Sequence, residues 1–145
     1  MSVTARDVRA ARAAVETVAR RTPMLSTRTF SERAGGTVSL KAENLQRTGS
    51  FKVRGVAAKL ASLGEEGCAN GVVAASAGNH AQGVALAARE LGIRATIFMP
   101  VGVALPKLQA TRGYGADVQL AGAVFDETNA AAIEYAQSHG AVFIP

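Results

Sequence analysis

The chain has 145 residues, which is long enough for one domain with a hydrophobic core, and its formal net charge is +5. Its basic residues are dispersed, only 5% of residues are aromatic, and no apolar run approaches the roughly 18 residues of a membrane span, so nucleic acid and membrane partners are not expected. The single cysteine and the lack of an apolar signal-peptide core favour a reducing, cytoplasmic location.

The first forty residues are predicted to contain two helices and a strand. Apolar spacing marks residues 4–20 as an amphipathic helix, and Thr4 with Asp7 resembles a capping box at its start. Residues 27–34 are predicted to form a short second helix, followed by a strand over residues 37–42.

A longer helix is predicted to begin at Lys52. Apolar residues recur there at helical spacing, at Val53, Val56, Ala57 and Leu60. Thr48 or Ser50 is expected to cap the start of this helix. Cys68 follows in a polar stretch, and we interpret it as an incidental loop cysteine, the alternative being a reactive thiol.

The rest of the chain alternates between apolar runs and helical patterns. The runs, which start about 21 to 25 residues apart, lie at 71–75, 95–99, 116–120 and 141–144. The helical patterns between them lie at 81–91, 106–113 and 125–138. Three of the four runs are near-continuous, and such runs at this spacing are typical of buried parallel strands joined by crossover helices. The sequence therefore predicts a small α/β domain with a doubly wound parallel sheet.

Lys52 is a candidate nucleophile. At the first turn of its helix, the positive end of the helix dipole disfavours a charged amine, and burial would act in the same direction. A neutral lysine amine attacks aldehydes and ketones to form a Schiff base. The alternative is that Lys52 is an ordinary solvated lysine beside a helix start. Its position, taken alone, favours this alternative.

Residues 76–80, Ser-Ala-Gly-Asn-His, follow a predicted strand and open a helix. The unpaired N–H groups of a helix start favour an anion, and Gly78 lets a ligand approach the backbone closely. The alternative is an ordinary strand–helix turn capped by Asn79. His80 is open to two interpretations, a substrate contact or a donor to a backbone group, whereas His139 is expected only to end a helix.

Several segments match one enzyme family in order and spacing. They are E-N-L-Q-R-T-G-S-F-K-V-R-G at 43–55, S-A-G-N-H-A-Q-G at 76–83, R-T-P at 21–23, M-P-V-G at 99–102 and A-T-R-G-Y-G-A-D-V at 110–118. The chain thereby resembles the pyridoxal-phosphate enzymes of fold type II, and more narrowly the threonine ammonia-lyases, also called threonine dehydratases or deaminases. A joint match of this length is far more specific than a lone glycine motif.

The resemblance implies pyridoxal 5'-phosphate as the cofactor and gives roles to both segments. Lys52 would carry the cofactor as a Schiff base and later remove the substrate α-proton. Phe51 would pack beside the pyridine ring, and Asn79 would meet the 3-oxygen of that ring. The loop implied to bind the substrate comprises Ser76, Ala77, Gly78, Asn79 and His80. The resemblance implies no metal ligand in this stretch.

The implied reaction is β-elimination, which converts L-threonine to 2-oxobutanoate and ammonia and acts also on L-serine, giving pyruvate. Serine racemase or serine ammonia-lyase of the same superfamily is the alternative. Racemases typically carry S-S-G-N-H in the loop, so Ala77, which has no proton to exchange, favours elimination. Cysteine synthases carry an S-G-N-T type of loop that this chain lacks. A further alternative is a catalytically incomplete fragment that only binds a small molecule.

The resemblance also implies how the chain divides. Residues 1–50 would belong to the larger domain of the enzyme, and residues 51–145 would form its small α/β domain. The remainder of the larger domain, with the glycine-rich loop that cradles the cofactor phosphate, would lie outside this chain. We expect an amino-acid substrate and a homo-oligomer.

Overall fold

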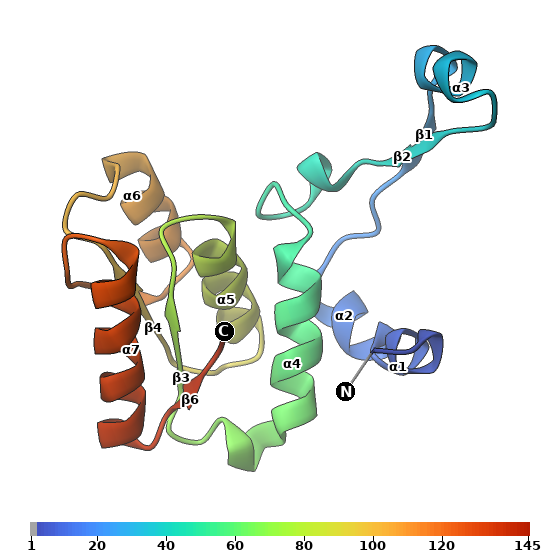
Figure 1. The fold of residues 1–145 in the computed structure, drawn as a ribbon. Coiled ribbons are helices and arrows are strands. Elements are labelled where there is room, and N and C mark those ends of the chain that lie inside the picture. The colour runs from blue at the N-terminus through green and yellow to red at the C-terminus, as the bar shows by residue number, and fades with distance from the viewer. Residues whose placement is uncertain (1–2) are drawn as a thin grey trace.

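A four-stranded parallel sheet lies at the centre of the molecule, as the sequence predicts (Figure 1). The structure is a computed structural model that describes residues 3–145. The strands, in the spatial order β5-β4-β3-β6, are β3 (Val72–Ala75), β4 (Ala95–Met99), β5 (Asp117–Leu120) and β6 (Val142–Phe143). In the register of the sheet, Val72 lies opposite Ala95 on one side and Val142 on the other.

Helices cover both faces, so the sheet is doubly wound. One face carries α4 (Lys52–Gly67), α5 (Asn79–Glu90) and α6 (Leu105–Gly113), and the other carries α7 (Phe125–His139) (Figure 1). On β3, Val72 and Ala74 join the larger core cluster, and Val73 and Ala75 join the smaller one beneath α7. The chain runs from β3 out to β5 and returns through α7 to β6, so the strand order reverses between β3 and β6.

The predicted helix over residues 4–20 is instead two helices. They are α1 (Ala5–Ala10) and α2 (Arg12–Val18). The predicted capping box is confirmed, because the Thr4 hydroxyl accepts from the Asp7 N–H at 3.3 Å and the Thr4 N–H donates to Asp7 Oδ2 at 2.8 Å.

The break between α1 and α2 separates an exposed segment from a packed one. Val18 of α2 is 2% exposed and joins the core cluster that contains Val53 and Leu60 of α4. Val8 of α1 is 64% exposed and belongs to neither cluster. The apolar face predicted for one continuous helix therefore packs on the body only in its second half.

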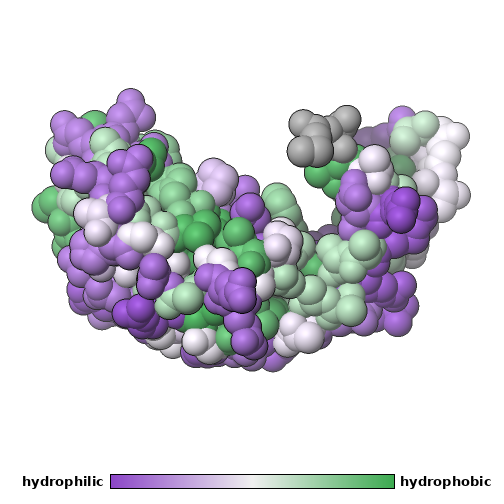
Figure 2. All heavy atoms as spheres, turned by 90° about the horizontal axis from the view of Figure 1, so that it is seen from below, coloured by the Kyte–Doolittle hydropathy of each residue, from purple (hydrophilic) through white to green (hydrophobic). Residues whose placement is uncertain are grey.

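A short antiparallel hairpin and one helix form an arm that projects from the body (Figure 1). The arm comprises β1 (Met24–Ser26), α3 (Arg28–Ala34) and β2 (Ser39–Lys41). The sequence predicts α3 and β2 but not β1, whose three residues are too few to show alternation. In the space-filling view the outline of the molecule is concave between its two ends, and apolar residues reach the surface along this concave side (Figure 2).

Cys68 is buried at the end of α4, and the prediction of a loop cysteine is wrong about its surroundings. Its N–H group donates to Gly64 O at 3.2 Å and Glu65 O at 3.1 Å. Burial raises the pKa of the Cys68 thiol. A protonated, enclosed thiol is a poor nucleophile, which agrees with the interpretation of this cysteine as incidental.

Among residues 3–145, no helix combines the length and the apolar character that crossing a membrane requires.

Candidate functional site

Lys52 is the first residue of α4, as predicted, but its side chain is exposed. The expectation that this side chain is buried is therefore wrong for this structure. The predicted cap is wrong as well, because Phe51 is the N-cap residue without a side-chain hydrogen bond, and the Thr48 hydroxyl donates to Ser50 O at 3.4 Å. Lys52 Nζ lies 5.5 Å from the centroid of the Phe51 ring, so these two side chains lie together at the helix start.

Glu43 and Arg54 hold the turn that leads into Lys52. Arg54 Nε donates to Glu43 Oε2 at 2.9 Å and Arg54 Nη2 donates to Glu43 Oε1 at 2.8 Å. The Thr22 hydroxyl also donates to Glu43 Oε1. The Arg54 hydrogen bonds lower the pKa of Glu43 to about 2, against the opposing effect of burial. Because these partners lie before and after Lys52 in the chain, the ion pair fixes where the helix starts.

Gln46 and Arg47 tie the same turn to α2 and α5. Gln46 Oε1 accepts from Arg20 N at 2.8 Å, and Gln46 Nε2 donates to Arg20 O at 2.9 Å. Arg47 Nη1 donates to Val18 O at 3.0 Å, and Arg47 Nη2 pairs with Glu90 at 2.9 Å. The polar side chains of this motif therefore support the backbone, and sequence reasoning missed that role.

Residues 76–80 form the turn between β3 and α5, at the carboxyl end of β3. Gly78 is the N-cap residue, with φ −145° and ψ −144°, and no side chain caps the helix, so Asn79 is not the cap that an ordinary turn would use. The Gly78 N–H donates to Ser76 Oγ at 3.2 Å, and the Gln82 N–H donates to Gly78 O at 3.3 Å.

Three consecutive N–H groups at the start of α5 have no acceptor within the described residues. They belong to Asn79, His80 and Ala81. The positive end of the dipole of this 12-residue helix lies at the same point. Donors and dipole together suit a carboxylate or phosphate, so the predicted anion site has the local geometry it needs.

The side chain of His80 is half-buried and faces the backbone at the end of β6. Its Nε2 lies 3.2 Å from Ile144 O. Burial lowers the pKa of His80, the nearby charge of Lys52 acts the same way, and the hydrogen bond to Ile144 opposes both. Of the two interpretations of His80, this contact favours the donor to a backbone group.

Lys52 and His80 line one cavity of about 300 Å³. The whole lining consists of Phe51, Lys52, Gly55, Val56, Lys59, His80, Ile144 and Pro145. His80 follows β3 and Ile144 follows β6, so the cavity adjoins the point where the strand order reverses. Ligands of doubly wound sheets bind at such a switch point.

The structure thus brings three predicted residues, Phe51, Lys52 and His80, into one lining. Ser76, Ala77, Gly78 and Asn79 lie in the adjoining turn and do not line this cavity. Sequence reasoning missed Lys59 and Ile144. Lys59 lies seven residues, about two helical turns, after Lys52, so helical spacing offered a signal. Nothing local in the sequence marks Ile144.

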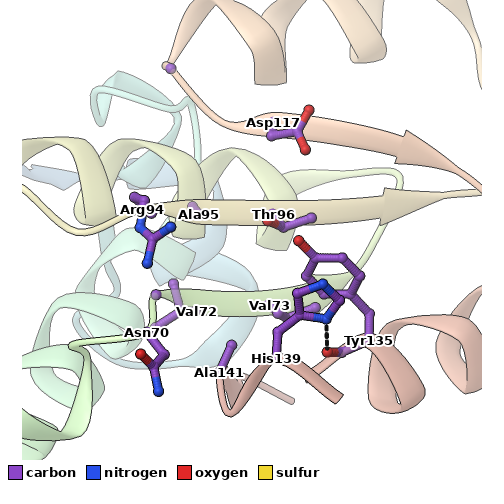
Figure 3. A pocket seen from close by; sticks show the side chains of 12 residues that line it. Asn70, Val72, Val73, Arg94, Ala95, Thr96, Asp117, Tyr135, His139 and Ala141 are labelled. Atoms are coloured by element: carbon purple, nitrogen blue, oxygen red, sulfur yellow. Dashed lines mark hydrogen bonds between the residues drawn. The ribbon is translucent and has the colours of Figure 1, made fainter. Parts of the chain in front are cut away.

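A second cavity, of about 370 Å³, lies at the opposite, amino, ends of the strands (Figure 3). Arg94, Thr96 and Asp117 line it from the side of β4 and β5. Tyr135 and His139 line it from α7, with their rings stacked at 3.8 Å and His139 Nδ1 at 2.9 Å from Tyr135 O. It contains none of the residues to which the sequence assigns chemistry, and His139 serves the end of its helix.

Comparison with known proteins places this geometry in a family. The family model described as "Pyridoxal-phosphate dependent enzyme" matches residues 15–145. The chain belongs to this family of pyridoxal-phosphate dependent enzymes.

Several members of the pyridoxal-phosphate family are similar to nearly all of this chain. An L-threonine ammonia-lyase of Thermotoga maritima is 50% identical over 142 residues, which is 98% of this chain and 35% of the relative. A threonine deaminase structure from Solanum lycopersicum has 39% identity and a TM-score of 0.88, covering 97% of this chain and 41% of that one. The structure of maize serine racemase has 30% identity and a TM-score of 0.91, covering 100% of this chain and 44% of that one. The chain therefore spans less than half the length of these relatives.

The described residues fit the cofactor that the family uses. Pyridoxal phosphate presents an aldehyde, a flat ring and anionic oxygens. The cavity offers the amine of Lys52 and the exposed ring of Phe51, with the unpaired N–H groups of residues 79–81 in the adjoining turn. Ser50 Oγ is buried with no hydrogen-bond partner in the described part of the chain, so one further polar group stands two residues before Lys52.

Proposed function

We propose that the protein containing this chain is an ammonia-lyase that converts L-threonine to 2-oxobutanoate and ammonia, and L-serine to pyruvate and ammonia. The observation that carries the proposal is the Lys52 amine in one cavity with His80, whose helix begins with three unpaired N–H groups. The 50% identity to an L-threonine ammonia-lyase supports the choice of substrate.

The roles proposed for the residues follow from their chemistry. The Lys52 amine would hold the cofactor at its aldehyde, and Lys52 Nζ would take the substrate α-proton. Phe51 and Asn79 contact the cofactor. The turn of residues 76–80 holds the substrate carboxylate, and the unpaired N–H groups of residues 79–81 at the positive end of the α5 dipole support this role.

Pyridoxal phosphate, when bound, supplies a ring system that takes up the electron pair left at the substrate α-carbon. Removal of the α-proton and departure of the β-hydroxyl eliminate one water across the Cα–Cβ bond. Hydrolysis of the resulting enamine consumes one water and releases ammonia. The sum is therefore one L-threonine converted to one 2-oxobutanoate and one ammonia, without an added oxidant or reductant.

Racemisation of serine is the second candidate, because maize serine racemase shares the fold over the whole chain. A racemase needs a group that gives a proton to the face of the α-carbon opposite Lys52. Ala77 stands in the loop where racemases typically carry a serine, and its methyl side chain holds no exchangeable proton. This residue favours elimination.

The division of the chain, its location and its assembly also belong to the proposal. Residues 1–50 form part of a larger domain and residues 51–145 form the small domain, with α2 as a bridge because it packs on α4. The one cysteine, buried and free, agrees with a reducing cytoplasm. The dispersed basic residues argue against a nucleic-acid partner, and the lack of an apolar run of membrane-spanning length argues against a membrane partner. We also propose a homo-oligomer.

The decisive experiment maps the lysine that carries the cofactor in the full-length protein. Reduction with borohydride and peptide mapping should place the pyridoxyl group on Lys52, and a label on Lys41, Lys59 or Lys107 would overturn the assignment. Lys52→Arg should lose at least about a thousandfold of the turnover of threonine, because its guanidinium stays protonated and cannot act as a base. Lys107→Arg on α6 is the control and should keep full turnover.

The choice between elimination and racemisation is tested on serine with the same protein. Chiral chromatography should find pyruvate as the main product and little D-serine. Comparable rates of D-serine and pyruvate formation would instead support the racemase.

A further inference from the structure

The start of α5 is held at two points, His80 and Gly83, which lie three residues apart on one face of the helix. His80 Nε2 lies 3.2 Å from Ile144 O. Gly83 packs so closely on α4 that an added Cβ would lie 3.3 Å from Val53 N and 3.4 Å from Lys52 C. The start of α5 is therefore in contact with both the end of β6 and the backbone of Lys52, the residue proposed as the nucleophile.

The carbonyl group to which His80 is linked is itself fixed to the sheet. Ile144 is 3% exposed, and its N–H donates to Val73 O at 2.8 Å. Because Val73 belongs to β3 and β3 leads into α5, the His80 contact closes a ring of β3, α5 and β6. A closed ring restricts the movement of the helix start more than the strand–helix connection alone.

The contact also specifies the state of the imidazole. A carbonyl oxygen can only accept, so His80 must carry its proton on Nε2. Burial lowers the pKa of His80, which favours the neutral ring with Nδ1 unprotonated. The Nε2 donor is thus engaged with Ile144 and Nδ1 can only accept, so the donor that His80 still offers to an anionic ligand is its unpaired backbone N–H.

We propose that the His80 side chain is a positioning residue that holds the unpaired N–H groups of residues 79–81 in place relative to Lys52. It acts through Ile144 O and does not touch the substrate. The contact itself stands on the geometry described above. Its effect on substrate binding rests on the proposed function, in which those N–H groups hold the substrate carboxylate.

The contact is tested first in residues 1–145 by NMR. The ring ¹⁵N shifts of His80 should show the Nε2–H tautomer at pH 7. Hydrogen exchange of the Ile144 amide should accelerate about tenfold or more in His80→Leu, the effect of losing one hydrogen bond. His80→Gln, whose amide nitrogen can donate to the same carbonyl, should restore exchange to within about threefold of wild type. An Nδ1–H tautomer, or equal exchange in all three proteins, would overturn the proposal.

The effect on binding is then tested in the full-length protein. His80→Leu should raise KM for threonine about tenfold with little change in kcat, and His80→Gln should recover KM. His139→Gln, a change at the other histidine, should leave both constants unchanged. A rise in KM without recovery by Gln would show that the ring touches the substrate, and an unchanged KM would show that the contact is only structural. A wild-type protein inactive on threonine would refute the proposed function, while the NMR result would still decide the contact.

Discussion

The carboxylate of Glu43 and the guanidinium of Arg54 form a two-point ion pair, with N–O distances of 2.9 and 2.8 Å, that spans the turn before Lys52. The pair is partly enclosed, since the side chains of Glu43 and Arg54 are 16% and 30% exposed. Parallel hydrogen bonds between a guanidinium group and a carboxylate fix the relative orientation of the two groups as well as the distance between them. The start of α4, and with it the proposed nucleophile, is therefore held by a contact nine residues upstream of it.

Replacing Glu43 by Gln should lower the free energy of unfolding by about 1–3 kcal/mol, between the values for an exposed and a buried ion pair. Urea unfolding followed by circular dichroism measures the change. Glu16→Gln is the matched control, because the Arg12–Glu16 pair has the same 2.9 Å contact with side chains 69% and 61% exposed. It should change stability by less than about 0.5 kcal/mol. Equal effects of the two substitutions would show that the Glu43 pair does not anchor the turn.

The same ion pair makes stability depend on pH in the acid range. Hydrogen bonds from Arg54 lower the pKa of Glu43 from 4.5 to about 2 in the folded chain. The unfolded state therefore binds more protons between these values, so the contribution of Glu43 is present above about pH 4.5 and is lost as the pH falls toward 2. The melting temperature should fall over that window in wild type and fall less in Glu43→Gln. Parallel curves for the two proteins would contradict this assignment.

Much of the body could be predicted because its signals are local. Each buried strand is an apolar run, as in β3, whose four residues are all buried. Helix α7 ends at His139, as the sequence predicts, and Gly140 adopts φ 61° directly after it. The signal for the predicted anion site is likewise local, since the unpaired N–H groups belong to a turn that the sequence places between a strand and a helix.

The features that sequence reasoning missed depend on residues far apart in the chain. The His80 contact joins residues 64 positions apart, and Gln46 meets Arg20 across 26 positions. The spacing of residues along a short segment gives no sign of such long-range pairs. The exposure of Lys52 also could not be predicted. Helical spacing identifies which face of α4 is buried, but it does not show how much of the remaining surface the neighbouring elements cover.

Ser50 offers a test of its unpaired hydroxyl. Its Oγ is buried and has no hydrogen-bond partner in the described residues. Ser50→Ala removes this hydroxyl without breaking a hydrogen bond, so it should leave the free energy of unfolding unchanged or raise it by up to about 1 kcal/mol. Thr128→Val is the contrast, because the fully buried Thr128 hydroxyl lies 2.7 Å from Ala121 O and 3.0 Å from Val124 O. That substitution should cost about 1–2 kcal/mol in urea unfolding. A comparable loss in Ser50→Ala would mean that its hydroxyl is hydrogen-bonded in solution.

Gly83 is the position where the packing of α5 on α4 is most sharply testable. In a helix, Gly→Ala normally stabilises by up to about 1 kcal/mol. At Gly83 the new methyl would lie 3.3 Å from Val53 N and 3.4 Å from Lys52 C, backbone atoms that cannot turn away as a side chain can. Overpacking of this kind costs about 1–3 kcal/mol, so Gly83→Ala should be destabilising in sum.

Gly55 in α4 supplies the matched control for this prediction, because an added Cβ there meets nothing within 4 Å. Gly55→Ala should raise the free energy of unfolding by about 0.5–1 kcal/mol. The two substitutions should therefore change stability with opposite signs when urea unfolding is measured under one set of conditions. In Gly83→Ala, backbone NMR shifts should also move at Lys52 and Val53, where the helices touch. Stabilisation by both substitutions, with no shift at Lys52, would show that α5 stands further from α4 in solution and does not hold Lys52 in place.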